Sequence, residues 1–419
     1  MRRYYEQSGK VEKIGNRVCI FVKNTIEFRV EDERTYNHRF CECLQGLGRL
    51  WTVRQYSRGD GMNIYDIAKL SGVSIATVSR VVNGSPRVSE KTKQKVLAVM
   101  EEAEYTPNVF ARGLGLNSMK TIGILCPDIS DQYMAEAVSH LEKRLHEYGY
   151  DCILSCSGSA QEAREHHTKL LLSKRIDTLI LVGSLYAGSG KNPGETEYVR
   201  AAAQQVPVFM INGYVEGENI YCSYGDDRQG AYDVTQALIR RGKKRILFLY
   251  DSQTYSARQK MQGYESALAD AGYPILGDLK HYIRPFDMHQ PDGAGLSDFS
   301  ESSSGYMQNK VLYVKEMLLA HRTLEFDSVF ACNDGLAVGV LKYARAKGLS
   351  VPEELSVAGY NNSTMAVCCE PELTSVDNQV KRLCSDAVDR ILKVLQGEED
   401  VEQNHKVRCE IVRRCSTDF

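Results

Sequence analysis

Two short segments of helical periodicity, separated by a glycine, constrain the fold more than any other feature of this chain. The first begins at Ile64 and the second spans residues 76–83, with a break at Ser71-Gly72-Val73 between them. Apolar residues recur at helical intervals in both and would lock the helices together: Ile67, Ala68, Val73, Val78 and Val81. Two helices joined by a tight glycine turn form a helix-turn-helix, whose second helix lies in the DNA major groove.

The side of the second helix that faces away from this apolar contact carries the candidate base contacts. That side consists of Ile75, Ala76, Thr77, Ser79 and Arg80. An arginine at position 80 can donate two parallel hydrogen bonds to a guanine edge. A third helix is expected to begin after Ser89 as N-cap. Periodicity alone also allows an ordinary pair of packed core helices.

The run from residue 65 to residue 114 resembles the LacI/GalR family of bacterial repressors. It matches the patterns "YDIAxxxGVSxxTVSRVVN" and "VSxxTxxKVxxxxxxxxYxPNxxARxL" at nearly every position. The resemblance implies a hinge that becomes helical on operator DNA, with Leu114 inserted into a minor-groove base step. Gly113 disfavours a helix before binding. The resemblance also adds these DNA contacts to the candidate set: Tyr65, Ser74, Asn83, Asn108, Ala111 and Arg112.

Charge and cysteine usage agree with a DNA-binding intracellular protein. Residues 1–120 contain 20 Lys or Arg against 13 Asp or Glu, and the remaining residues contain 32 against 41. A basic end on an acidic body is expected where one end meets phosphates. The 13 cysteines include no CxxC pair, so we interpret them as free thiols in a reducing cytoplasm. No apolar stretch is long enough to span a membrane.

From Thr121 onwards, short apolar strands alternate with amphipathic helices. This rhythm predicts an α/β fold with parallel sheets, and its two tandem series predict two lobes with a cleft between them. Residues 121 to about 416 resemble the periplasmic-binding-protein-like core of the same family, in phrases such as "RGKKRILFL" and "FACNDGLAVGVLKYARAKGLSVPEELSVAGYNN". We expect a DNA-binding domain at 62–106 and a hinge and linker at 107–120. The core would cover 121–419, with an N-lobe of about 121–222 and 379–403 and a C-lobe of about 223–378 and 404–419.

Ligands of open parallel sheets bind beyond the carboxyl ends of the strands. The residues just past the predicted strands are therefore candidate effector contacts: Asp128, Tyr133, Ser184, Asn212, Arg258, Lys260, Asn333, Asp334 and Asn361. The chain departs from the family at Asn212 and Asn361, where aspartate is usual, and at Lys260, where arginine is usual. These departures make the cleft less negative. They predict a neutral or anionic ligand, with Lys260 and Arg258 supplying charge.

Two further segments contain no candidate functional residues. Residues 285–306 are rich in Asp, Ser, Gly and Pro and indicate an extended loop. Residues 1–61 match no known pattern beyond a possible strand at 18–22. We expect them to be an extension without folded structure or upstream sequence read in the same frame, with an accessory domain as the alternative.

The sequence as a whole predicts a cytoplasmic, homodimeric transcriptional regulator of the LacI type. We expect a repressor of carbohydrate uptake or catabolism genes that binds palindromic operator DNA and responds to a sugar-like effector. We expect no cofactor, no metal and no enzymatic activity, because no P-loop, GxGxxG, HExxH or catalytic triad is present. Control by a phosphorylated partner protein is an alternative within this class. A solute-binding protein and an enzyme are alternatives from other classes.

Overall fold

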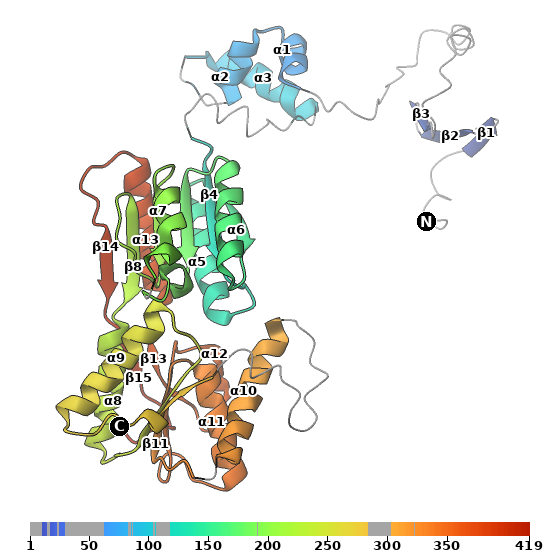
Figure 1. Cartoon of the computed structure of the whole chain (residues 1–419). Helices are drawn as coiled ribbons and strands as arrows, with labels where there is room; N and C mark the ends of the chain where they lie inside the picture. Colours follow the sequence, from blue (N-terminus) through green and yellow to red (C-terminus); the bar gives the residue numbers. More distant parts are fainter. Residues whose placement is uncertain are drawn as a thin grey trace, which may run out of the picture. The chain divides into compact units, whose positions relative to one another are not determined.

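The computed structural model describes residues 11–14, 17–22, 25–29, 63–82, 85, 87–103, 105, 118–190, 192–283, 303–321 and 323–419. It divides the chain into two compact units, Met1–Asn108 and Val109–Phe419 (Figure 1). Five predicted DNA contacts lie outside the described residues: Asn83, Asn108, Ala111, Arg112 and Leu114.

Three helices form the DNA-binding domain of the first unit, as the periodicity predicts. They are α1 (Ile64–Ser71), α2 (Ile75–Val82) and α3 (Glu90–Glu102). Asn63 and Asp66 form a capping box at the start of α1, and Gly72 ends this helix in the left-handed region with φ of 63°. The helices share a small core of Ile67, Ala68, Val78, Val81, Val96 and Met100.

A three-stranded antiparallel sheet precedes this domain, which the sequence interpretation did not expect. Its strands are β1 (Val11–Ile14), β2 (Arg17–Val22) and β3 (Thr25–Arg29), in the order β1-β2-β3. The predicted strand at 18–22 is present as β2. The flanking strands were missed because short hairpin partners without a sustained alternation give little signal in the sequence.

The first lobe of the second unit is a parallel sheet in the order β14-β8-β7-β6-β4-β5. The strands are β4 (Thr121–Cys126), β5 (Asp151–Cys156), β6 (Thr178–Val182), β7 (Val208–Ile211), β8 (Ile220–Gly225) and β14 (Asn404–Val407). One face packs on α5 (Gln132–Glu147) and α13 (Val380–Leu395). The other packs on α6 (Gln161–Ser173) and α7 (Glu197–Ala203). The central strands β6 and β7 are buried along their whole length, as expected for a sheet covered on both faces.

The second lobe has the same construction. Its sheet has the order β10-β9-β11-β12-β13-β15, parallel except for β15. The strands are β9 (Ile246–Tyr250), β10 (Lys280–Tyr282), β11 (Ser328–Ala331), β12 (Ser356–Tyr360), β13 (Thr374–Asp377) and β15 (Glu410–Val412). Helices α10 (Ser303–Ala320) and α11 (Asp334–Lys347) cover one face, and α8 (Asp227–Arg240) and α9 (Tyr255–Asp270) the other. A short helix α12 (Thr364–Cys368) follows β12.

The chain crosses between the lobes after β8, after β13 and after β14, so each lobe is built from separated segments. Strand β14 pairs with β8 from residue 404 to residue 407 and belongs to the first lobe. The expected lobe boundary at residue 404 therefore differs from the observed one. The loop predicted for residues 285–306 also differs, because α10 begins at Ser303. Among the described residues, no helix is long and apolar enough to cross a membrane.

Candidate DNA-binding surface and interlobe site

The predicted recognition helix α2 presents most of its candidate contacts to solvent. Ile75 is 41% exposed, and Ala76 and Arg80 are exposed as well. Tyr65 on α1 is 67% exposed, which is unusual for a large aromatic side chain in a three-helix domain. An exposed tyrosine, isoleucine and arginine on one small domain form a surface suited to contact with another molecule.

The start of α2 is fixed by hydroxyl groups. The Ser74 Oγ accepts a hydrogen bond of 3.2 Å from the Thr77 backbone N–H and lies 2.9 Å from the Thr77 Oγ1. Ser74 thus acts as the N-cap of the helix, and it holds the first turn in place before any DNA is bound. Ser79 lies on the same helix and is half-buried.

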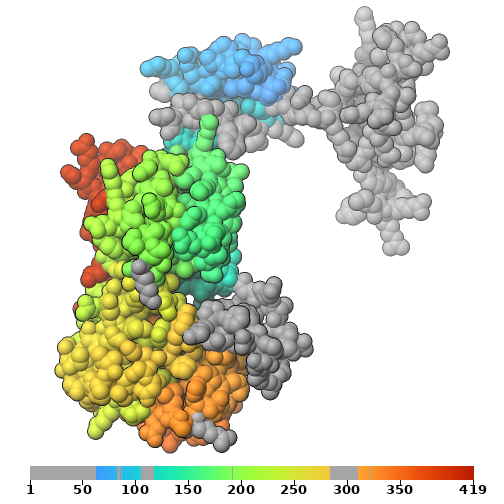
Figure 2. Space-filling view, viewed as in Figure 1, coloured from blue at the N-terminus to red at the C-terminus, as the bar shows by residue number. Residues whose placement is uncertain are grey.

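The interlobe site lies where the strand order of each sheet reverses. In the first lobe β4 has β5 on one side and β6 on the other, and in the second lobe β9 lies between β10 and β11. Such switch points leave a crevice at the carboxyl ends of the strands. Side chains from the two lobes meet there: Ser184 Oγ, just after β6, donates to Thr254 Oγ1 at 2.9 Å, and Gln132 hydrogen bonds to Thr364. Figure 2 shows the surfaces of the two lobes in direct contact.

The first-lobe side of this site combines the uncharged side chains of Tyr133 and Asn212 with the Asp128 carboxylate. The Tyr133 side chain is in the first turn of α5, and its hydroxyl is buried with no hydrogen-bond partner among the described residues. Burial raises the pKa of Tyr133 well above its ordinary value. Asn212 directly follows β7, is 8% exposed and has φ of 61°, and its Oδ1 is likewise buried without a partner. Asp128 caps the turn after β4 by accepting a 2.9 Å hydrogen bond from the Ser130 N–H.

The second-lobe side contains a buried ion pair. Asp251 directly follows β9, and one of its oxygens lies 2.6 Å from the Lys310 Nζ. The Asn333 Nδ2 donates to both Asp251 oxygens at 3.1 Å. Burial alone would raise the pKa of Asp251, but Lys310 and Asn333 together hold it below its ordinary value. Asn333 also caps α11, because its Oδ1 accepts from the Leu336 N–H.

Two predicted effector contacts, Lys260 and Asp334, bond to other residues of the second lobe. The Lys260 Nζ donates to the Cys332 carbonyl at 3.1 Å and lies 3.7 Å from the centre of the Tyr360 ring. The Asp334 carboxylate accepts from the Ser363 N–H and the Ser375 Oγ, both at 2.6 Å. Burial raises the pKa of Asp334 despite these hydrogen bonds. Both side chains therefore bind their own lobe tightly in this structure.

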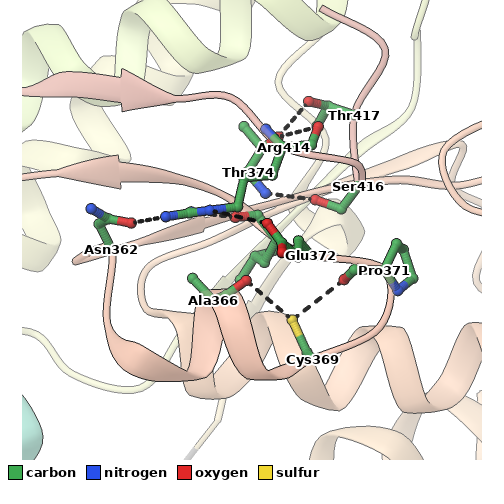
Figure 3. Close-up of polar contacts among 10 residues, drawn as sticks. Asn362, Ala366, Cys369, Pro371, Glu372, Thr374, Arg414, Ser416 and Thr417 are labelled. Atoms are coloured by element: carbon green, nitrogen blue, oxygen red, sulfur yellow. Dashed lines mark hydrogen bonds and ion pairs between the residues drawn. The ribbon is translucent and has the colours of Figure 1, made fainter.

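The loop after β12 is shaped by the end of the chain, as Figure 3 shows. The Arg414 guanidinium donates to the Asn362 Oδ1 at 2.6 Å and to the Leu373 carbonyl at 2.7 Å. Next to Asn362, Asn361 has φ of 92°, and its Oδ1 accepts a 3.4 Å hydrogen bond from Asn378. Arg414 thus holds the loop after β12, in which Asn361 accepts the hydrogen bond from Asn378.

Four buried polar atoms without a partner among the described residues lie just past the carboxyl ends of four different strands. They are the Tyr133 hydroxyl, the Asn212 Oδ1, the Arg258 Nε and the Asn378 Oδ1. Arg258, in the first turn of α9, reaches the first lobe, because a Cβ built on Gly190 would lie 2.5 Å from its guanidinium nitrogens. Buried polar groups are almost always satisfied in proteins. Unsatisfied ones that follow strands of both lobes are candidates for contacts that a polar ligand completes.

Asp251, Asn378 and Arg414 were missed by the sequence reasoning. Asp251 and Asn378 each come directly after a strand, so the rule that selected Ser184 and Asn212 would have found them. Arg414 gives no such signal, since it lies 52 residues from Asn362 and contacts it only through the fold.

Comparisons with known proteins agree with both parts of the molecule. Residues 63–108 match the family model "Bacterial regulatory proteins, lacI family", and residues 235–417 match that of the periplasmic binding protein-like domain. An HTH-type transcriptional regulator of Lachnoclostridium phytofermentans is 43% identical over 85% of this chain and 100% of its own length. Catabolite control protein A of Priestia megaterium is 30% identical over 82% of this chain and 95% of its own.

A structure of the Lac repressor dimer bound to operator and the anti-inducer ONPF has a similar fold. Its TM-score is 0.70 at 24% identity, and the match covers 86% of this chain and 100% of the repressor chain. A three-helix DNA-binding domain joined to a two-lobed sensor defines a ligand-responsive transcriptional regulator. The chain belongs to the lacI family of bacterial regulatory proteins.

Proposed function

We propose that this regulator is a repressor of carbohydrate uptake or catabolism genes, and that a neutral, polyhydroxylated effector in the interlobe site controls it. The cluster of unpartnered Tyr133, Asn212 and Asn378 atoms carries the proposal. A tyrosine hydroxyl and two amides can donate to and accept from sugar hydroxyls. A relative named for catabolite control supports the gene class, and one neighbour in fold was solved as a complex with cellobiose.

The bonding of Lys260 and Asp251 within the second lobe favours a neutral ligand that accepts a hydrogen bond from Arg258, whose Nε is buried without a partner among the described residues. Lys260 is committed to Cys332 and Tyr360, and Asp251 to Lys310 and Asn333. Extracting either group for a ligand would break hydrogen bonds that are buried in the second lobe, which is costly. We therefore assign Lys260 and Asp334 to the fold, and Tyr133, Asn212, Arg258, Asn361 and Asn378 to the ligand.

Calorimetry with four panels tests the effector class: neutral mono- and disaccharides, sugar phosphates, sugar acids and amino sugars. We expect binding from the neutral panel. With the best ligand, Tyr133→Phe should lower affinity about fivefold, since one hydrogen bond contributes about 1 kcal/mol. Tyr198→Phe is the matched control, because Tyr198 is a buried tyrosine on α7, at the opposite face of the same sheet. Binding confined to phosphates or amino sugars, or an equal loss in both variants, would reject the assignment.

We propose that α2 reads a palindromic operator as part of a cytoplasmic homodimer, with one recognition helix per half-site. After selection of an operator from random DNA, Arg80→Ala should lose roughly 1–3 kcal/mol of discrimination at one base pair in each half-site. Lys91→Ala, at the exposed start of α3, should weaken all sequences alike. If Arg80→Ala weakened operator and random DNA equally in fluorescence anisotropy, Arg80 would not read a base.

A further inference from the structure

Two thiols lie side by side at the carboxyl ends of neighbouring strands in the first lobe. Cys126 is the last residue of β4 and Cys156 is the last residue of β5, and the two are partners in the parallel register. Their sulfur atoms are 3.8 Å apart. Cys126 is fully buried, whereas Cys156 is exposed.

The backbone geometry of this pair is compatible with a covalent bond. Neighbouring strands lie about 4.7–4.9 Å apart, and cysteines joined by a disulfide have Cα atoms about 4.4–6.8 Å apart. A disulfide needs its sulfurs at about 2 Å, so the side chains must rotate toward each other while the strands stay in register.

We propose that Cys126 and Cys156 form a reversible intramolecular disulfide, with a peroxide as the oxidant. Cys156 is the sulfur that a peroxide reaches first, because it is exposed. Burial raises the pKa of the Cys126 thiol to about 12, so Cys126 remains protonated until the second step. In a reducing compartment such a disulfide is transient and acts as a sensor of oxidation.

The chemistry balances in two steps. The Cys156 sulfur attacks one oxygen of hydrogen peroxide and the O–O bond breaks. The departing hydroxide takes the Cys156 proton and leaves as water, and Cys156 becomes a sulfenic acid. The Cys126 sulfur then attacks the Cys156 sulfur, the S–O bond breaks, and the departing hydroxide takes the Cys126 proton to leave as a second water. Two thiols and one peroxide thus give one disulfide and two waters. An external dithiol returns the two electrons by thiol–disulfide exchange.

The pair lies under the loops of the first-lobe switch point. The Ser157 N–H donates to the Cys126 carbonyl at 3.0 Å, and the Gly158 N–H donates to the Pro127 carbonyl at 2.9 Å. These contacts connect the thiol pair to the turn that carries Asp128. Closure of the disulfide would withdraw the Cys126 sulfur from the core between the sheet, α5 and α13. This loss of packing opposes the stabilisation that a cross-link gives by constraining the unfolded chain, so we expect oxidation to shift the thermal unfolding midpoint.

Non-reducing peptide mapping of the full chain tests the proposal, and it requires neither operator nor effector. The folded protein is treated with hydrogen peroxide, its remaining thiols are blocked, and linked peptides are identified by mass spectrometry before and after dithiothreitol. We expect the peptide linking Cys126 to Cys156 to be the most abundant linked pair and to disappear on reduction. The matched variants are Cys156→Ser, which removes one partner, and Cys152→Ser, which removes a neighbouring thiol of β5.

The variants separate the possible outcomes. Cys156→Ser should lose the linked peptide and the peroxide-dependent shift in unfolding midpoint completely, while Cys152→Ser keeps both. Since Cys156 is exposed, this substitution leaves the core intact. The proposal is overturned if Cys156 accumulates as sulfinic acid, if the links join two chains, or if Cys152→Ser abolishes the response.

Discussion

The two lobes of the sensor have the same strand order around their switch points, yet they place opposite chemistry there. In the first lobe, β5-β4-β6-β7-β8 presents the neutral Tyr133 and Asn212. In the second, β10-β9-β11-β12-β13 presents Asp251, paired with Lys310. The first-lobe groups have no partner among the described residues, whereas the second-lobe pair is 6% and 12% exposed and bonded within its lobe.

This difference shows that the fold determines where a site can form, while the loops and covering helices determine what it can do. The pKa of the buried Asp251 is lowered because Lys310 of α10 and Asn333, the N-cap of α11, contact its carboxylate. The first lobe has no counterpart to this pair at its switch point among the described residues. We therefore infer that the Asp251–Lys310 pair serves the stability of the second lobe, whereas the unpartnered Tyr133 and Asn212 of the first lobe serve the ligand.

The largest effect is expected from Lys310→Met, which leaves the Asp251 carboxylate buried without its cation. Removing one partner of a buried pair should lower the free energy of unfolding by roughly 3–5 kcal/mol. Urea denaturation measures the loss, and hydrogen exchange of the β9 and β11 amides localises it. The control is Lys280→Met in the same lobe, whose pair with Glu265 is 25% and 30% exposed. It should cost about 1 kcal/mol or less. Equal losses would mean that the Lys310 pair has no special role.

The pH dependence of the same pair gives a second, intermediate effect. Because Lys310, Asn333 and Lys260 lower the pKa of Asp251, its contribution to stability is present above the ordinary aspartate pKa of about 3.9. This contribution is lost as the pH falls through the lower pKa of the folded state. In Lys310→Met, burial should instead raise this pKa, so protonation becomes stabilising.

The stability difference between wild type and Lys310→Met should therefore shrink between pH 7 and pH 4. Urea denaturation at several pH values measures this difference. The raised pKa of Asp334 acts in both proteins and cancels in the comparison. A difference that stays constant with pH would show that Lys310 stabilises the lobe by packing alone.

The sequence predicted where the two switch points lie better than it predicted the bonding partners of the residues there. Period and spacing located both switch points, because strand ends and helix starts are local features, and Ser184 and Asn333 do lie there. The partners of these residues are set by long-range packing. Lys310 contacts Asp251 from a helix whose beginning had been assigned to a loop. Nothing local to Lys260 indicates that Tyr360, 100 positions further along the chain, covers its ammonium.

In the DNA-binding domain the sequence was more informative, because its fold rests on local contacts. Ile67, Val78 and Val81 were predicted as the core and are buried. Of the small sheet before this domain only β2 was predicted, as no long apolar periodicity accompanies the other two strands. The contrast follows from the number of residues that separate two contacting residues in the sequence. Residue spacing predicts contacts within a few helical turns. It says little about contacts between residues that are far apart in the sequence.

The smallest effect is expected from Tyr133→Phe in the protein without effector. This substitution breaks no hydrogen bond with the described residues and removes a hydroxyl whose burial is unfavourable. The free energy of unfolding should stay the same or rise by up to about 1 kcal/mol, as measured by urea denaturation beside Lys310→Met. A group that stabilised its lobe would show a loss instead. If Tyr133→Phe lost more than about 1 kcal/mol, its hydroxyl would serve the fold, and the contrast between the ligand-directed Tyr133 and the Asp251–Lys310 pair would fail.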